Sequence, residues 1–118
     1  MRTSRGDYAA ARLHWALWKQ GAAAGHSEAQ WHLGRAYEDG KGTDKDWGQA
    51  YAWYRCALAS AEASMKGEPA LEARIAADVR KSLASLVARL SPEQHDRGRR
   101  LAAEYLAAYV KDRKVRRP

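Results

Sequence analysis

The 118-residue sequence has one cysteine, three prolines, no phenylalanine and no long apolar run. Cys56 has no cysteine to pair with inside the chain, so folding does not require an oxidising compartment. No segment approaches the ~18 consecutive apolar residues that a membrane span needs, and the N-terminus lacks the apolar segment and cleavage site of a signal peptide. We therefore expect no membrane span and a cytoplasmic location.

Sequence motifs for several chemistries are also missing. There is no glycine-rich phosphate-binding loop, no helix-turn-helix signature and no zinc-finger signature. Glu28 and His32 lie one helical turn apart with His26 nearby, but no third metal ligand follows at a useful spacing. Cys56 lies among aromatic residues, where cysteine behaves as a small apolar side chain, and nothing supports a Cys–His nucleophile pair. We expect no catalytic residue, no cofactor and no metal.

What the chain does contain favours one helical domain. Alanine is abundant and favours helix, and five tryptophans and six tyrosines supply large apolar side chains. A chain of this length can bury about two-thirds of its unfolded surface. We expect a single domain spanning residues 1–118.

The stretch that begins at Ser27 predicts two short amphipathic helices. In the first, which runs to about Tyr37, Ser27 and Gln30 have the spacing of a capping box, and Ala29, Leu33 and Tyr37 form an apolar stripe. Such a stripe indicates a helix with one face packed against a neighbour.

Glycines then predict how the two helices meet. Gly34 costs about 1 kcal/mol relative to alanine in a helix interior, so we expect a second helix very close to it. Gly40 ends the first helix and Gly42 permits a second bend. Asp44 or Asp46 caps the second helix, whose apolar side carries Ala50, Trp53, Tyr54 and Ala57.

Twelve residues of this stretch have a characteristic spacing: Ala29, Gln30, Leu33, Gly34, Tyr37, Gly40, Gly42, Asp46, Ala50, Trp53, Tyr54 and Ala57. This spacing resembles the Sel-one-like repeat (SLR), a branch of the tetratricopeptide-like helical solenoids. Thr43 departs from the family pattern, in which valine is usual. One complete repeat, residues 27–66, covers about a third of the chain. The resemblance implies a helical solenoid and a role in protein–protein interaction, and it names no partner.

The N-terminal segment predicts half of an earlier repeat. A helix over 6–24 begins with Asp7 as cap and has an apolar face of Tyr8, Ala11, Trp15 and Trp18. Trp15 and Tyr51 lie 36 residues apart, as do Trp18 and Tyr54, which suits a repeat of helix pairs.

The C-terminal part predicts two further helices. Gly67-Glu68-Pro69 breaks the preceding helix, and a long helix from about Pro69 to Leu90 follows, with apolar residues Leu71, Ile75, Val79, Leu83, Leu86, Val87 and Leu90. Ser91-Pro92-Glu93-Gln94 begins the last helix, which runs to about Lys111 with Leu101, Ala102, Tyr105, Leu106, Ala108 and Tyr109 facing inward. Residues 69–115 are interpreted as a terminal cap and 112–118 as a basic tail. The predicted fold is all-α: a short α/α solenoid of about one and a half antiparallel helix-pair repeats, closed by a C-terminal helical hairpin.

Two surfaces are candidates for binding. In the resembled family, the first helix of each repeat lines the concave surface, which implies partner-binding residues Glu28, Trp31, His32 and Arg35. The alternative for Trp31 is core packing, and the alternative for the other three is an exposed polar face without a partner.

The second candidate is a basic patch, which the net charge of +7 draws attention to. It consists of Arg97, Arg100, Lys111, Arg113, Lys114, Arg116 and Arg117. Such a patch suits phosphates, anionic lipid headgroups or an acidic protein, and the alternative is a solvated outer face. No exposed aromatic is interleaved with it, which argues against a single-strand stacking platform.

The sequence therefore predicts a non-catalytic protein–protein interaction module, an adaptor, regulator or inhibitor. Its partner is another protein, for which an acidic protein is one option, and a homodimer stays open. A viral or effector-type antagonist that blocks a host complex fits the same chemistry, and the expected origin is bacterial or phage-like. The alternative function is binding of nucleic acid or an anionic surface through the basic patch.

Overall fold

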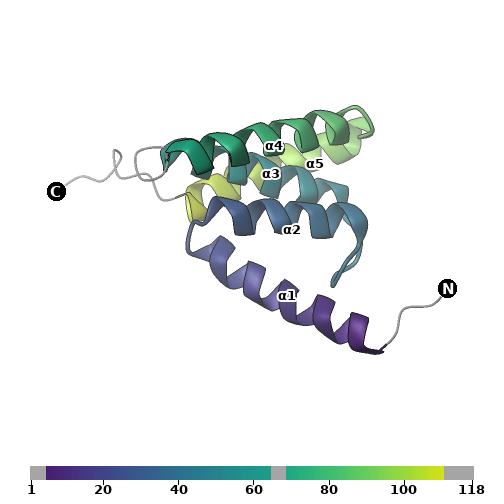
Figure 1. Ribbon diagram of the computed structural model, residues 1–118. Helices are drawn as coiled ribbons and strands as arrows, with labels where there is room; N and C mark the ends of the chain where they lie inside the picture. The colour runs from purple at the N-terminus through teal and green to yellow at the C-terminus, as the bar shows by residue number, and fades with distance from the viewer. Residues whose placement is uncertain (1–4, 65–68, 111–118) are drawn as a thin grey trace.

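The described part of the computed structural model is built from α-helices alone (Figure 1). It comprises residues 5–64 and 69–110, with side chains from Leu13 onward. The helices are α1 (Arg5–Ala23), α2 (Ser27–Asp39), α3 (Trp47–Ala63), α4 (Pro69–Val87) and α5 (Pro92–Tyr109). These ranges contain no strand, which confirms the predicted all-α class. None of these helices combines the length and apolar character that crossing a bilayer requires.

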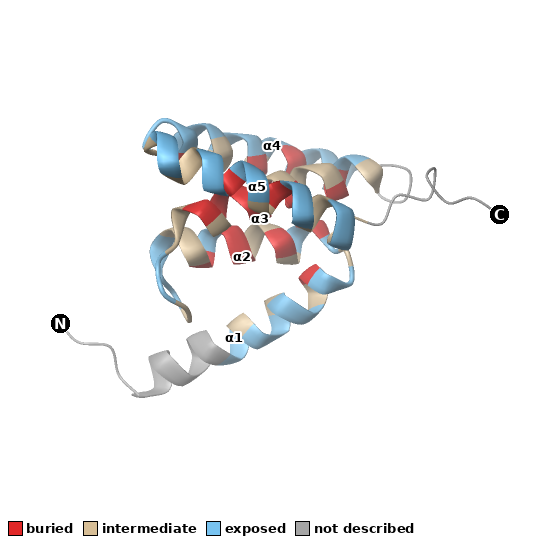
Figure 2. Cartoon of the chain, turned by 180° about the vertical axis from the view of Figure 1, so that it is seen from behind, coloured by how far each residue is buried: buried red, intermediate tan, exposed pale blue. Residues whose placement is uncertain are grey.

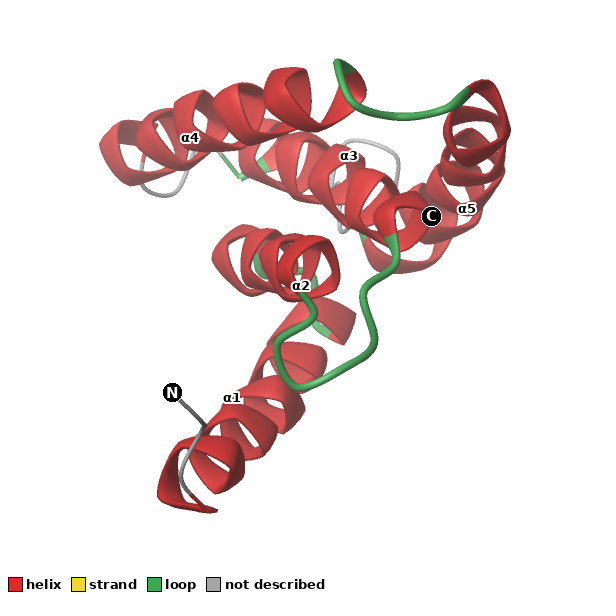
Figure 3. Cartoon of the chain, turned by 90° about the vertical axis from the view of Figure 1, so that its right-hand side faces the viewer, coloured by secondary structure: helices red, strands yellow, loops and turns green. Residues whose placement is uncertain are grey.

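Helix α3 lies at the centre of the fold. It packs against α2, α4 and α5, which surround it in Figure 3. Most of its circumference is buried as a result, and the buried residues gather there in Figure 2. The residues of α3 in the main core cluster are Ala50, Tyr51, Ala52, Tyr54, Ala57 and Ala61. Because many of these are alanines, neighbouring helices can approach the α3 backbone closely.

The contact between α2 and α3 confirms the role predicted for Gly34. A Cβ atom at Gly34 would lie 2.5 Å from two ring carbons of Tyr54, well inside van der Waals contact. Tyr54 is fully buried, so the missing side chain of Gly34 provides the space for its ring.

Local signals for the helix ends are confirmed at three places. Gly40 ends α2 with a φ of 75°, and Gly42 makes the second bend with a φ of 80°. Asp46 caps α3 by accepting from the backbone N–H of Gln49 at 3.2 Å. Ser91 and Gln94 form the predicted capping box at the start of α5, at 3.1 and 2.9 Å.

The predicted capping box at Ser27 and Gln30 is wrong. His26 occupies the N-cap position of α2 without a side-chain cap bond. The hydroxyl of Ser27 donates instead to Glu72 of α4, at 2.7 Å. Gln30 is fully buried, and its amide donates to the backbone carbonyls of Ala22 and Tyr109, both at 3.0 Å. Tertiary partners therefore replace the local pairing that the spacing indicated.

The N-terminal helix differs from its prediction at its start. α1 begins at Arg5, so Asp7 lies inside the helix rather than at its cap. Trp15 and Trp18 are half-buried against α2, as predicted for the apolar face. The side chains of Tyr8 and Ala11, which belong to the same predicted face, lie outside the described residues.

The two C-terminal helices depart from the predicted hairpin. α4 and α5 both pack on α3, whereas they make little contact with each other. α4 ends at Val87 rather than Leu90, and Leu71 and Val87 of its predicted apolar face are exposed at 43% and 37%. Ala108 of α5 is also exposed. Four predicted features lie outside the described residues: the end of the repeat at residue 66, the Gly67-Glu68 break, the end of the last helix at about Lys111 and the basic tail 112–118.

Candidate functional site

The predicted partner-binding residues lie together along the side of α2 that α3 does not cover. We call Glu28, Trp31, His32 and Arg35 the α2 ridge. Glu28 and Arg35 are exposed, whereas Trp31 and His32 are half-buried. Trp31 contacts α4 on one side of the ridge, and His32 contacts α1 on the other. The structure thus places all four residues on one surface between two neighbouring helices.

Trp31 and Arg35 form the part of the ridge that faces α4. The indole N–H of Trp31 donates to the hydroxyl of Ser82 at 3.2 Å. The guanidinium of Arg35 lies 5.3 Å from the ring centroid of Trp31, within the range of a cation–π contact. Trp31 also packs against the main core, so part of its ring has the packing role that we gave as the alternative.

His32 and Glu28 form the part of the ridge that faces α1. The ring of His32 stacks on Trp18 of α1, with centroids 5.0 Å apart and an angle of 12° between the planes. Its Nε2 lies 3.8 Å from a carboxylate oxygen of Glu28. Burial lowers the pKa of His32 below 6.5, assisted by Arg35 and His14 and opposed by Glu28. His32 is therefore mainly neutral at pH 7.

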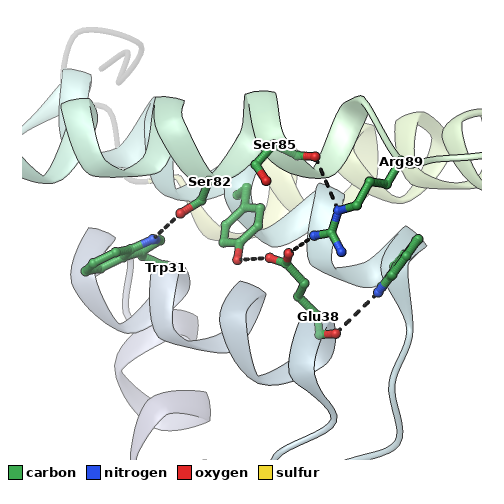
Figure 4. A network of polar contacts seen from close by, with 7 residues as sticks. Trp31, Glu38, Ser82, Ser85 and Arg89 are labelled. Carbon is green, nitrogen blue, oxygen red and sulfur yellow. Dashed lines mark hydrogen bonds and ion pairs between the residues drawn. The ribbon is translucent and has the colours of Figure 1, made fainter.

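A polar network under the ridge joins three helices (Figure 4). The carboxylate of Glu38 accepts from the hydroxyl of Tyr54 at 2.6 Å and pairs with Arg89 in the turn that follows α4. The indole N–H of Trp47 donates to the backbone carbonyl of Glu38 at 3.3 Å, and Arg89 lies over the Trp47 ring. Burial, with Glu38, raises the pKa of Tyr54 above its ordinary value, so the phenol stays protonated and donates. The network holds α2 in place against α3 and α4.

Sequence reasoning did not find this network. Glu38 and Arg89 lie 51 residues apart in the chain. Neither residue belongs to a motif that would suggest the pairing.

Two hollows border the ridge. The first hollow, of about 430 Å³, lies where α1, α2 and α4 meet, and its lining includes Trp18, Glu28, His32, Leu71 and Glu72. The second hollow, of about 340 Å³, lies between α2 and α4 and is lined by Arg35, Glu38, Asp39, Tyr54, Lys81, Ser82 and Ser85. Hollows beside a row of charged and aromatic side chains suit a site that side chains of another molecule can enter.

The basic patch is only partly within the described residues. Arg97 donates to the carboxylate of Asp46 at 2.6 Å, so its charge is paired inside the chain. Burial alone would raise the pKa of Asp46, but the bond from Arg97 and those from the backbone hold it below its usual value. Arg100 is exposed. Lys111, Arg113, Lys114, Arg116 and Arg117 lie outside the described residues, so binding of nucleic acid through this patch stays a prediction.

Cys56 is buried in the core and has no feature of an activated nucleophile. Burial raises the pKa of its thiol to about 12, so the thiol is protonated at neutral pH. Its Sγ lies 3.6 Å from the backbone carbonyl of Tyr105. Within the described ranges, no group of three or more histidine, cysteine, aspartate or glutamate side chains is placed to hold a metal ion.

Comparison of the chain with protein-family models, with curated protein sequences and with solved structures finds no match in any of the three. The resemblance to the Sel-one-like repeat therefore stays a prediction.

Proposed function

We propose that this chain is a non-catalytic helical module that binds a partner protein across the α2 ridge, as an adaptor, regulator or inhibitor. The observation that carries the proposal is the α2 ridge itself, a row of exposed charged and half-buried aromatic side chains bordered by two hollows. Tryptophan and arginine contribute a large share of the binding energy in many protein interfaces. Here Trp31 and Arg35 already contact each other, so little side-chain ordering is left for binding.

The rigidity of the surface also supports this function. The Glu38 network fixes α2 against α3 and α4, and the stack of His32 on Trp18 fixes it against α1. A preformed surface loses less conformational entropy on binding than one that must order first.

The proposed architecture is a short solenoid of about one and a half helix-pair repeats, with α4 and α5 as its terminal cap. α1 packs on α2, α2 on α3, and α3 on α4, an order of neighbours compatible with a solenoid. The contact of Gly34 with Tyr54, two positions of the Sel-one-like spacing, is also compatible with it. The packing of α5 on α3 adds a contact that a simple stack of hairpins lacks.

Charge reversal on the ridge tests the proposed function. The variant Glu28→Lys/Arg35→Glu reverses the charge of the two exposed residues of the ridge and leaves the stack of His32 on Trp18 in place, so its helicity should match that of the wild type. Capture of the partner from a lysate of the native source, followed by mass spectrometry and calorimetry with the purified partner, should show loss of binding in this variant.

A matched control places the same kind of change elsewhere. Glu93→Lys/Arg99→Glu alters two exposed residues of α5 and should leave binding unchanged. Unchanged binding in the ridge variant would show that the partner docks elsewhere. A titration of the same proteins with nucleic acid over a salt series identifies the alternative, because phosphate binding weakens steeply with salt.

A further inference from the structure

The first hollow has an unusual charge for this chain. Among the described residues that line it, the carboxylates are Glu28 and Glu72, the histidines are His26 and His32, and there is no lysine or arginine. The chain as a whole carries 21 lysines and arginines against 14 acidic residues. The second hollow and a further one beside Arg97 each contain side chains of both signs. The first hollow is therefore a negative site on a positive molecule.

Hydrogen bonding holds one of these carboxylates in place. One oxygen of Glu72 accepts from the hydroxyl of Ser27, a buried residue at the start of α2. Glu28 lies beside His32, which is mainly neutral at pH 7 and so leaves the charge of Glu28 largely uncompensated. Both carboxylates thus line the hollow without an ion pair to a lysine or arginine among the described residues.

Apolar side chains line the hollow beside the carboxylates. Ile75 is buried at 5% exposure, and Leu71 is exposed at 43% although it belongs to the apolar face of α4. Trp18 is half-buried and adds an aromatic ring. A side chain that combines an apolar stem with a cationic head fits this combination, and lysine and arginine are the residues that have both.

We propose that the first hollow binds an arginine or lysine side chain of the partner protein. The cationic head lies between Glu28 and Glu72, and the methylene stem packs against Leu71 and Trp18. This inference rests on the proposed function, since Glu28 and His32 belong to the α2 ridge. The net charge of the chain does not prevent such binding, because salt screens charges beyond about 8 Å at physiological ionic strength.

A nuclear magnetic resonance titration of the full chain tests the inference directly. The probe is the peptide acetyl-Gly-Ser-Arg-Ser-Gly-amide, and its control replaces the arginine with citrulline, which has nearly the same shape and no charge. The arginine peptide should shift the amide signals of Ser27, Glu28 and Glu72 and the indole signal of Trp18, with saturation in the millimolar range. The citrulline peptide should leave these signals in place.

Charge-neutral variants identify the carboxylates as the cause. Glu28→Gln/Glu72→Gln keeps an acceptor for Ser27 while removing both charges, and should weaken binding of the arginine peptide about fivefold. Glu93→Gln, at an exposed position of α5, should bind the peptide as the wild type does. The amide spectrum of each variant reports whether it is folded.

Three results would overturn the inference. The first is the absence of shifts at these amides, and the second is equal shifts with both peptides, which would indicate an apolar occupant. The third is a dependence of the same signals on chain concentration without peptide, which would indicate a second copy in the hollow. The proposed function is tested separately by Arg35→Glu, because Arg35 does not line this hollow. If Arg35→Glu abolishes partner capture and Glu28→Gln/Glu72→Gln does not, the partner binds the α2 ridge but places no arginine or lysine side chain in the first hollow. That result would support the proposed function and refute this inference.

Discussion

Replacing Gly34 with alanine tests the closest approach between α2 and α3. The added methyl group would lie 2.5 Å from Cδ1 and Cε1 of Tyr54, about 1 Å or more inside the optimal carbon–carbon separation. The Tyr54 ring cannot turn aside easily, because it is fully buried and its hydroxyl is bonded to Glu38 at 2.6 Å. The strain must therefore be relieved by moving the helices apart.

The expected magnitude follows from two opposing effects. Overpacking a well-packed core costs about 1–3 kcal/mol, and a methyl group 2.5 Å from a fully buried ring belongs to the upper part of that range, about 2–3 kcal/mol. Alanine favours the helix over glycine by about 1 kcal/mol. The free energy of unfolding should therefore fall by about 1–2 kcal/mol, which lowers the Tm by roughly 4 °C for each kcal/mol in a domain of this size. Urea and thermal unfolding followed by circular dichroism measure both quantities.

Two controls separate the clash from the general effect of alanine. At Gly48 the added methyl group would first meet the guanidinium of Arg97, the far end of an exposed side chain that can move. Gly48→Ala should therefore not lower the free energy of unfolding, and the helix preference of alanine should raise it by up to about 1 kcal/mol. In a Tyr54→Leu background, Gly34→Ala should cost less than it does in the wild type, because the ring that it meets is gone. A Gly34→Ala variant as stable as the wild type would refute the close contact.

Two further predictions concern a helix cap and a pH dependence. Ser91→Ala removes the acceptor for the backbone N–H of Gln94, and thermal unfolding should show a loss of about 1 kcal/mol, with no loss if the cap contributes nothing. Because the pKa of His32 is lower in the folded state than 6.5, the unfolded state takes up the proton first as pH falls, so stability should decrease below about pH 6.5. Urea unfolding at several pH values should show a smaller decrease in His32→Gln; an equal decrease would contradict this origin.

Helix ends were predictable where the signal is local. Gly40 and Ser91 act on backbone groups within a few residues of themselves, so their spacing alone predicts the structure. At the start of α3 the sequence left Asp44 and Asp46 as alternatives, and the cap is Asp46. Gly34 was predictable for a related reason, since a glycine in a helix interior is unfavourable unless something needs its space.

Errors arose where a polar side chain has a distant partner. Ser27 and Gln30 have a capping-box spacing, yet they do not form one. The hydroxyl of Ser27 donates to Glu72 instead, and the amide of Gln30 donates to the carbonyl of Tyr109. The hairpin of α4 and α5 was a similar error. Each helix has an apolar face, but the sequence does not specify that both faces pack on α3.

The candidate site was predictable only along α2. Helical spacing places Glu28, His32 and Arg35 on one surface, and the structure agrees. The first hollow could not be predicted from the sequence, because it forms only where Leu71 and Glu72 of α4 lie beside the start of α2. Which helix borders which is a property of the tertiary packing and has no counterpart in the local pattern.

The amide of Gln30 connects the two ends of the fold. It binds a carbonyl at the end of α1 and another at the end of α5, 79 residues further along the chain than Gln30 itself. Neither terminal helix can fray at these carbonyls without leaving a donor unpaired in the interior. A fusion or truncation that disturbs Tyr109 therefore removes a hydrogen bond of Gln30 near the α1–α2 junction. A change at the C-terminal end of α5 thus destabilises the packing at the end of α1.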